Sequence, residues 1–172
     1  MIAKENNFAY IDGANLYKGV LGLGWQLDYR RFRVWLKEKY SVERAYLFIG
    51  LVAKHKNLYT YLQESGFTLV FKETVYSGNG EVKGNCDADM VLWTVKDAYE
   101  NVYEKAVLVS GDGDYAGLVS FLIEKNKLKA IVCPGDKCSI LLKRTNAPIV
   151  YLAPQQERLS IKEKAPDEDG TS

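Results

Sequence analysis

The stretch AVLVSGDGDYAGLV, residues 106 to 119, joins one apolar run to another through a turn of two glycines and two aspartates. The first run, Ala106 to Val109, is continuously apolar, which is typical of a strand buried on both faces of a parallel sheet. The second run spaces its apolar residues as one stripe of a helix. The stretch therefore predicts a strand, a turn and a helix. Its glycines suit a bound phosphate, whereas Asp112 and Asp114 would repel one.

Strand and helix signals alternate in the same way along most of the chain. Strands are expected at residues 8–11, 44–49, 67–71, 106–109, 129–133 and 149–152. Helices are expected at residues 16–21, 29–40, 54–65, 87–103, 115–125 and 139–144. The alternation predicts an α/β fold of three layers, α/β/α, with a mostly parallel, Rossmann-like central sheet. The polar, glycine-rich segment 73–85 interrupts it and is interpreted as a loop or a small hairpin.

The composition is typical of one globular domain with a polar tail. The 172 residues are 47% hydrophobic and 26% charged, with a net charge of +1. Residues 156–172 hold three basic and five acidic side chains (3 − 5 = −2), so residues 1–155 carry +3. We expect 1–155 to form the domain and 156–172 to be a disordered acidic tail. No apolar run approaches the roughly 20 residues of a membrane span, and the three cysteines lack framework spacing, so a cytoplasmic protein with free thiols is expected.

Four aspartates are expected at one edge of the sheet. Ligands of open α/β sheets bind beyond the carboxyl ends of the strands, where Asp12 follows the first strand and Asp112 and Asp114 follow the fourth. Asp87 lies one turn before the apolar stripe of the helix that it begins, so we expect it to face the sheet. That stripe consists of Val91, Val95, Ala98 and Val102.

These carboxylates have two interpretations. Taken singly, each is explained as a helix cap or a turn residue that bonds to the local backbone. Taken together, four like charges at one partly buried edge destabilise one another, and a hard divalent cation is the simplest neutraliser. Mg²⁺ and Mn²⁺ are the candidates, because both favour oxygen ligands.

Three motifs, in this order, resemble the NYN domain family in its LabA-like (DUF88) branch, which is similar to PIN nucleases. They are YIDGANLY at 10–17, KGNCDADMVL at 83–92 and KAVLVSGDGDYAGLVSFL at 105–122. The resemblance covers residues 8–152 and implies a PIN-like fold and Mg²⁺- or Mn²⁺-dependent cleavage of RNA. The implied catalytic residues are Asp12, Asn15, Asp87, Asp112 and Asp114. The four aspartates would bind the metal, Asn15 would orient a water or the substrate, and Ser110 would support the site or contact phosphate.

Several other side chains are candidates for contacts with single-stranded RNA. Lysines near the active edge are candidates for phosphate contacts or, alternatively, solvated surface charges: Lys18, Lys54, Lys56 and Lys83. A basic cluster of undetermined position consists of Arg30, Arg31 and Arg33. Tyrosines that would either stack on bases or belong to the core are Tyr17, Tyr76 and Tyr115. The sequence leaves a homodimer open.

Other functions fit the sequence less well. GDGDYAG resembles a dinucleotide-binding fingerprint, but it follows the fourth strand and carries acids where a pyrophosphate would lie. A catalytic triad is disfavoured because His55 is the sole histidine. A phosphatase with an aspartyl nucleophile is a further alternative. The nearly neutral charge keeps open a module that binds RNA or protein and cuts little.

Overall fold

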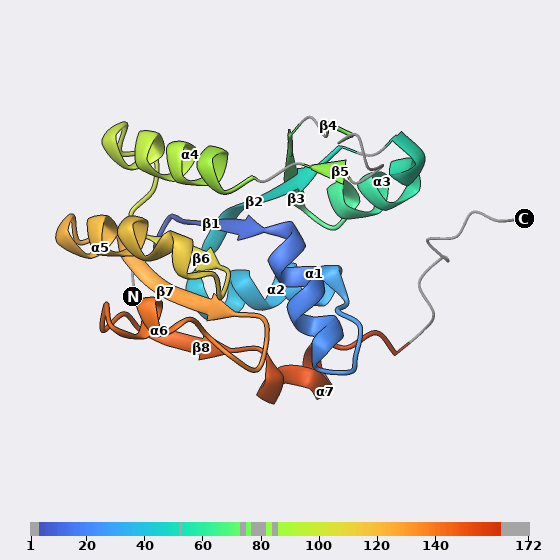
Figure 1. Ribbon diagram of the computed structural model, residues 1–172. Helices are drawn as coiled ribbons and strands as arrows, with labels where there is room; N and C mark the ends of the chain where they lie inside the picture. Colours follow the sequence, from blue (N-terminus) through green and yellow to red (C-terminus); the bar gives the residue numbers. More distant parts are fainter. Residues whose placement is uncertain (1–3, 52, 73–74, 77–81, 84–85, 163–172) are drawn as a thin grey trace, which may run out of the picture.

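The computed structural model describes residues 4–51, 53–72, 75–76, 82–83 and 86–162. Its centre is a six-stranded sheet in which every neighbouring pair of strands is parallel (Figure 1). The strands of this sheet are β1 (Asn7–Asp12), β2 (Val42–Gly50), β3 (Phe67–Lys72), β6 (Ala106–Val109), β7 (Leu128–Cys133) and β8 (Ile149–Tyr151). The expected six strands are confirmed. The expected small hairpin corresponds to an antiparallel pair, β4 (Val75–Tyr76) and β5 (Val82–Lys83).

Helices cover both faces of the sheet, as the alternation of signals predicted (Figure 1). The α-helices are α1 (Gly13–Gly22), α2 (Tyr29–Tyr40), α3 (Lys56–Glu64), α4 (Asp87–Tyr99), α5 (Ala116–Glu124), α6 (Ile140–Lys143) and α7 (Gln156–Leu159). Short 3-10 helices are η1 (Ala53–His55), η2 (Gly113–Tyr115) and η3 (Ala153–Gln155). Within the described ranges, no helix is long and apolar enough to cross a membrane.

The two faces of the sheet have separate cores. One core packs α1, α2, α3 and α7 against alternate residues of the strands, such as Ala9 and Ile11 of β1. The other packs α4, α5 and α6 against the opposite face, to which Tyr10 belongs. This alternation follows from the strand geometry, in which successive side chains point to opposite faces. The result is the three-layer α/β/α architecture of a PIN-like fold.

The strand order places the site. The sheet runs β3-β2-β1-β6-β7-β8, so the chain builds outward from β1 on one side and outward from β6 on the other. The order therefore reverses between β1 and β6, which are direct neighbours. In open parallel sheets, ligands bind in the crevice at the carboxyl ends of the two strands that flank such a switch point. Asp12 is the last residue of β1, and Ser110 directly follows β6.

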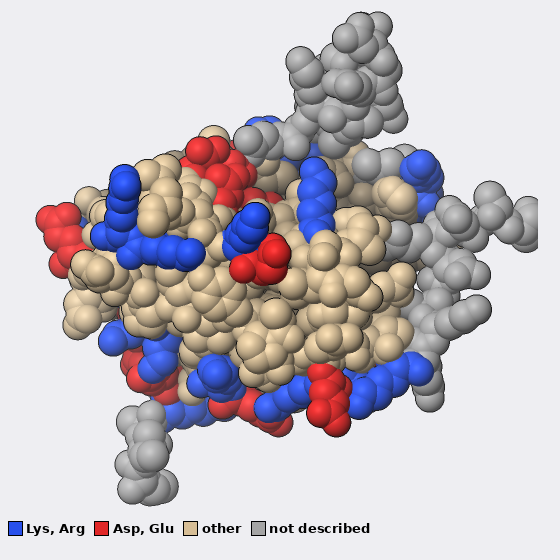
Figure 2. Space-filling model, turned by 60° about the horizontal axis from the view of Figure 1, so that its bottom comes forward, with Lys and Arg blue, Asp and Glu red and all other residues tan. Residues whose placement is uncertain are grey.

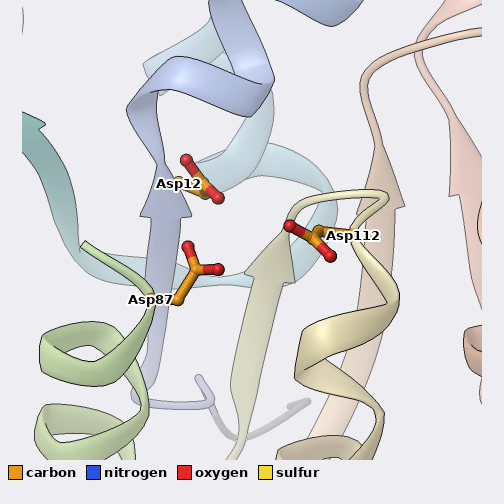
Figure 3. Close-up of side chains that lie close together, drawn as sticks. All are labelled: Asp12, Asp87 and Asp112. Atoms are coloured by element: carbon orange, nitrogen blue, oxygen red, sulfur yellow. The ribbon is translucent and has the colours of Figure 1, made fainter. Parts of the chain in front are cut away.

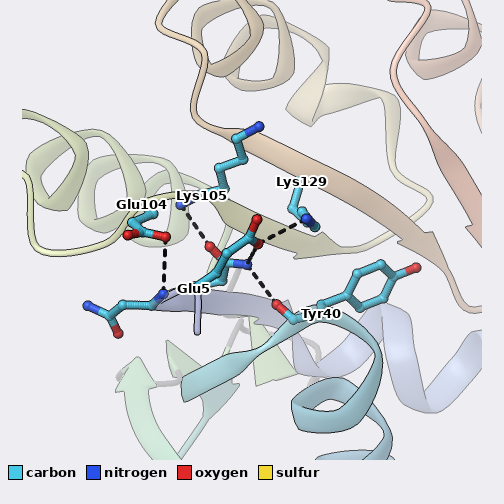
Figure 4. Close-up of polar contacts among 7 residues, drawn as sticks. Glu5, Tyr40, Glu104, Lys105 and Lys129 are labelled. Atoms are coloured by element: carbon cyan, nitrogen blue, oxygen red, sulfur yellow. Dashed lines mark hydrogen bonds and ion pairs between the residues drawn. The ribbon is translucent and has the colours of Figure 1, made fainter. Parts of the chain in front are cut away.

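The opposite, amino edge of the sheet is closed by a polar network around Asn7, which is fully buried (Figure 4). Its amide nitrogen donates to the carbonyl oxygen of Tyr40 and to the carboxylate of Glu5, both at 2.7 Å. Its amide oxygen accepts from the backbone N–H of Lys105 at 3.1 Å. Lys129 pairs with Glu5 at 2.9 Å. The network ties β1 to the end of α2 and to the strands beside it, so this edge is structural.

The structure corrects two boundaries. The helix expected over 87–103 ends at Tyr99, because Asn101 takes the left-handed conformation (φ 55°) that stops a helix. Its buried residues are Met90, Thr94 and Ala98, so the stripe lies beside the expected valine positions, and Val102 is exposed.

The sequence prediction placed the start of the disordered tail too early, at residue 156. Gln156–Leu159 forms α7, and Leu159 is fully buried in the core beside α1 and α2. The backbone then pairs with the chain before α2, where Leu27 bridges to Ser160. The burial of one leucine thus fixes a segment whose composition is mostly polar. Residues 163–172 lie outside the described part of the chain.

Candidate metal centre

A cavity of about 270 Å³ opens at the switch point. It is lined by Asp12, Ala14, Asn15, Lys18, Phe48, Ile49, Gly50, Cys86, Asp87 and Asp112. These residues come from the ends of β1 and β2, the first turns of α1 and α4, and the loop after β6. The cavity is therefore where a parallel sheet of this order is expected to bind a ligand.

Three carboxylates converge in this cavity (Figure 3). Asp12, Asp87 and Asp112 each offer one oxygen, and these oxygens all lie within 4.8 Å of one another. Asp12 stands at the end of β1, Asp87 at the start of α4 and Asp112 in the loop after β6. The expectation that aspartates from three separate segments meet at one edge is confirmed for these three residues.

Local hydrogen bonds hold two of these carboxylates. Asp12 is the N-cap of α1 and accepts from the backbone N–H of Asn15 at 3.1 Å. Asp112 is the N-cap of η2 and accepts from the backbone N–H of Asp114 at 2.9 Å. The capping interpretation of these aspartates is thus correct, and it is compatible with metal binding, since a carboxylate has lone pairs to spare. Asp87 is not an N-cap, because that position belongs to Cys86.

The electrostatics of the cluster favour a cation. Asp12 is only 7% exposed, and burial, with added repulsion from Asp87 and Asp112, raises the pKa of its carboxyl. Neither Asp12 nor Asp112 forms an ion pair with a lysine or arginine of the described residues. A set of clustered carboxylate oxygens matches the ligands that Mg²⁺ and Mn²⁺ prefer. The donor set therefore fits a hard divalent cation.

Tyr115 was predicted to stack on bases or to belong to the core, and the structure places it in the core. Its side chain is 2% exposed, which excludes base stacking. Its hydroxyl reaches the back of the cluster, 3.1 Å from Oδ2 of Asp12 and 2.9 Å from Oδ1 of Asp87. Burial, followed by the charge of Asp12, raises the pKa of this phenol, so it stays protonated. Sequence reasoning missed this contact with the carboxylates.

Asn15 and Ser110 hold the loop that carries Asp112. The amide oxygen of Asn15 accepts from the backbone N–H of Gly111 at 3.0 Å. The hydroxyl of Ser110 accepts from the backbone N–H of Asp112 at 3.1 Å. Ser110 is 2% exposed, and its hydroxyl supports the loop from within the protein. Asn15 lines the cavity, and its amide nitrogen donates no hydrogen bond to a described residue.

Gly111 and Gly113 lie in the turn that carries Asp112, and neither has a positive φ. Among the described glycines, only Gly24 and Gly66 have positive φ, so the aspartate loop needs no special backbone conformation. Close approach explains the two glycines instead. A β-carbon at Gly111 would lie 2.9 Å from Sγ of Cys133, and one at Gly113 would lie 2.5 Å from Oγ of Ser139.

Asp114 is not part of the cluster, in contrast to the expectation from sequence. It is exposed at the start of η2, and its backbone N–H is bonded to Asp112. The reason is local geometry: the turn that lets Asp112 cap η2 places the side chain two residues later at the surface. The structure therefore brings together three of the four predicted metal ligands.

The predicted basic contacts divide into near and distant residues. Lys18 is exposed and lines the cavity. Lys54 and Lys56 are exposed on η1 and α3 and do not line it. Lys83 belongs to β5, and its side chain lies outside the described part of the structure, as does that of Tyr76.

The basic cluster of α2 lies away from the site. Arg33 donates to the carbonyl oxygens of Val42, Glu43 and Gly66, at the amino ends of β2 and β3. The other two arginines pair locally, Arg30 with Glu64 and Arg31 with Asp28. Arg33 therefore stabilises the amino edge of the sheet. Tyr17 of α1 is 50% exposed.

Sequence reasoning also missed Lys72, the last residue of β3. Burial and then the charge of Asp12 raise the pKa of the Cys86 thiol to about 11, and Lys72 opposes them. A lysine charge thus acts on Cys86, which lines the cavity. The signal was present in the sequence, as a basic residue at the carboxyl end of a predicted strand. All three cysteines are free, as expected.

The described residues on one face of the molecule form no continuous basic stripe (Figure 2). On the face in Figure 2, basic side chains are scattered around a broad uncharged area and alternate with acidic ones along the lower rim. This distribution agrees with the net charge of +1.

Comparison with solved structures supports the fold. A protein of unknown function from Vibrio parahaemolyticus superposes with a TM-score of 0.71 and 23% identity, over 88% of this chain and 95% of that one. A PLP-bound protein assigned as an aminotransferase, from Clostridium difficile, gives a TM-score of 0.35 and 10% identity, over 81% of this chain and 40% of that one. The second superposition is too weak to carry an argument.

The sequence itself matches a known family. No curated protein matches the chain. The family model of the NYN domain, however, matches residues 8–147. NYN is a nuclease-type domain of the PIN-like superfamily, and NYN nucleases are metal-dependent and act on RNA. The matched residues include the whole carboxylate cluster and most of the sheet. The chain therefore belongs to the NYN domain family.

Proposed function

We propose that this chain is a ribonuclease that hydrolyses RNA phosphodiester bonds with Mg²⁺ or Mn²⁺ as its cation. The observation that carries the proposal is the convergence of Asp12, Asp87 and Asp112 at the switch point of an NYN domain. We also propose that the chain belongs to the LabA-like branch of the family and that its RNA substrate is single-stranded. The sequence motifs support the first of these proposals, and the open cavity supports the second.

Five residues of the cavity have a defined part in this proposal. Asp12, Asp87 and Asp112 would hold the cation, which supplies a water of lowered pKa and positive charge for a phosphate. The amide nitrogen of Asn15 can donate to a phosphate oxygen or to the attacking water. Lys18, on the first turns of α1, offers a positive charge to the neighbouring phosphate. Because the side chain of Lys18 is exposed, it can adjust to the path of the RNA backbone.

A direct test measures cleavage of a labelled single-stranded RNA in MnCl₂ and in EDTA. We expect cleavage by the wild type in MnCl₂, and none in EDTA or with Asp112→Asn. Asparagine is as good an N-cap as aspartate, so this variant keeps the loop and loses only the charge. Equal cleavage by the wild type and the variant would refute the assignment.

The alternative is a module that binds RNA or protein and cuts little. The observation in its favour is the nearly neutral charge, because strong nucleic-acid binders are usually basic. Fluorescence anisotropy of the same RNA separates the two functions. Tight binding without metal-dependent cleavage would establish the module and exclude the nuclease.

Lys18 gives a test of where the RNA lies. We expect Lys18→Ala to weaken RNA binding and to lower the slope of log Kd against log salt by about one, the share of one phosphate contact. Lys125 is a matched control, because it is an exposed lysine at the end of α5, next to the amino edge of the sheet. An equal effect of Lys125→Ala would show that the RNA does not bind at the cavity.

A further inference from the structure

The hydroxyl of Tyr115 occupies an unusual position for a core tyrosine. It lies against two of the three clustered carboxylates, at 3.1 Å from Asp12 and 2.9 Å from Asp87. Its ring packs in the core under α4 and α5. The hydroxyl therefore approaches the cluster from the protein interior, while the cavity lies on the solvent side.

A phenol has a single proton to donate, so it serves two carboxylates at different times or shares its proton between them. It links Asp12 and Asp87 without cancelling either charge. A lysine in this place would neutralise a carboxylate and compete with a cation. A phenylalanine would remove the hydroxyl that the two carboxylates share. A tyrosine is thus suited to hold carboxylates at a fixed spacing and still leave their charge to a metal.

The place of Tyr115 in the chain extends this link to the third carboxylate. Tyr115 ends η2, the 3-10 helix that Asp112 caps, so it lies three positions after Asp112 in the chain. The side chain reaches the end of β1 and the start of α4 from the loop after β6. One short, capped turn therefore connects all three segments that supply the cluster.

We propose that Tyr115 is the positioning residue of the metal centre, where its hydroxyl holds Asp12 and Asp87 at the spacing that a divalent cation requires. This inference rests on the proposed function, because it assumes that the three carboxylates bind a metal. It adds a residue whose role is exerted through the ligands and not through contact with the metal or the substrate.

Tyr103 provides a matched control for a tyrosine with a purely structural hydroxyl. It is 1% exposed, lies in the same core and donates its hydroxyl to the carbonyl oxygen of Thr94 at 2.9 Å. Removing either hydroxyl deletes one buried hydrogen-bond donor. The two variants should therefore lose similar stability, and metal affinity should distinguish them.

The test compares Tyr115→Phe with Tyr103→Phe by titration calorimetry with MnCl₂, after urea unfolding in EDTA has confirmed that both fold. We expect Tyr115→Phe to bind Mn²⁺ about 10- to 100-fold more weakly, the usual effect of removing a partner of a metal ligand, and Tyr103→Phe to bind as the wild type does. Unchanged affinity of Tyr115→Phe, or an equal loss in both variants, would overturn the inference alone. A wild type that binds no Mn²⁺ would overturn the metal site and this inference together.

A second measurement keeps the hydroxyl and so avoids a variant that fails to fold. 3-Fluorotyrosine is placed at position 115 or, as a control, at position 103, and Mg²⁺ is added in excess. We expect the ¹⁹F resonance at position 115 to shift and the resonance at position 103 to stay. A protein that binds Mg²⁺ without a shift at position 115 would contradict the proposed role.

Discussion

Replacing Asp12 with asparagine removes one negative charge from the metal centre and leaves the cap of α1 in place. The amide oxygen of asparagine can still accept the backbone N–H of Asn15, and the two residues are equivalent N-caps. The substitution therefore isolates the repulsion that Asp12 suffers from Asp87 and Asp112. We expect the metal-free variant to be more stable than the metal-free wild type.

The magnitude follows from the spacing of the oxygens. Two charges 4.8 Å apart repel by about 0.9 kcal/mol in bulk water and by about 3.5 kcal/mol at an effective dielectric constant of 20. Asp12 has two such neighbours, but both are half-buried and so are partly screened by solvent. The bond from Tyr115 also weakens when its acceptor becomes neutral, by about 1 kcal/mol. We therefore expect a net gain of about 1–2 kcal/mol, or about 2–8 °C in Tm for a chain of this size.

The assay is thermal and urea unfolding, first in EDTA and then in MnCl₂. In EDTA, Asp12→Asn should unfold at a higher temperature and a higher urea concentration than the wild type. At a metal concentration 100 times Kd, the wild type should gain about 2.7 kcal/mol, which reverses the order, while the variant gains little. Asp12→Ala is the control, since it removes the charge and also the cap, at a cost of about 1 kcal/mol. An asparagine variant that is less stable than the wild type in EDTA would refute the idea that the carboxylates repel one another.

Two further predictions use matched variants. Asp112→Asn should abolish measurable Mn²⁺ binding in calorimetry, whereas Asp114→Asn should change the Kd for Mn²⁺ little, because Asp114 is outside the cluster. Equal losses of affinity in the two variants would show that Asp114 is also a metal ligand. Gly19→Ala should cost about 1–3 kcal/mol in urea unfolding, because its β-carbon would lie 2.8 Å from the backbone nitrogen of Gly135. In the same helix, Gly22→Ala meets no atom within 4 Å and should be neutral or stabilising by up to about 1 kcal/mol. A Gly19→Ala variant as stable as Gly22→Ala would show that α1 is less tightly packed than described.

The sheet and its active edge could be predicted because their signals are local. Short, continuously apolar runs such as Ala106 to Val109 are typical of buried strands in a parallel sheet. Once the strands are known, the polar residues that follow them are known too, and Asp12 and Asp112 were found in this way. Asp87 was found because an acid on an apolar helical stripe must face the core or a ligand.

The remaining features depend on packing between distant segments. The predicted face of α4 was right in part: Ala98 is buried, and Val91 and Val95 pack half-buried against the core, but Met90 and Thr94 are the more buried positions. Met90 and Val91 are both apolar, and only the tertiary fit selects Met90. Similarly, Asp112 and Asp114 are chemically alike, and the capping of η2 decides which of them faces the cavity. The contact of Tyr115 with carboxylates from two other segments has no sequence signal at all.

If Asp12, Asp87 and Asp112 together bind a divalent cation, a crystal soaked in MnCl₂ will show the ion between them. We expect an anomalous difference peak at about 2.0–2.2 Å from one oxygen of each carboxylate, a hard-cation distance. The peak should be absent from crystals of Asp112→Asn treated in the same way. A soaked wild-type crystal with no peak in this cavity, or with Mn²⁺ bound elsewhere, would contradict the claim.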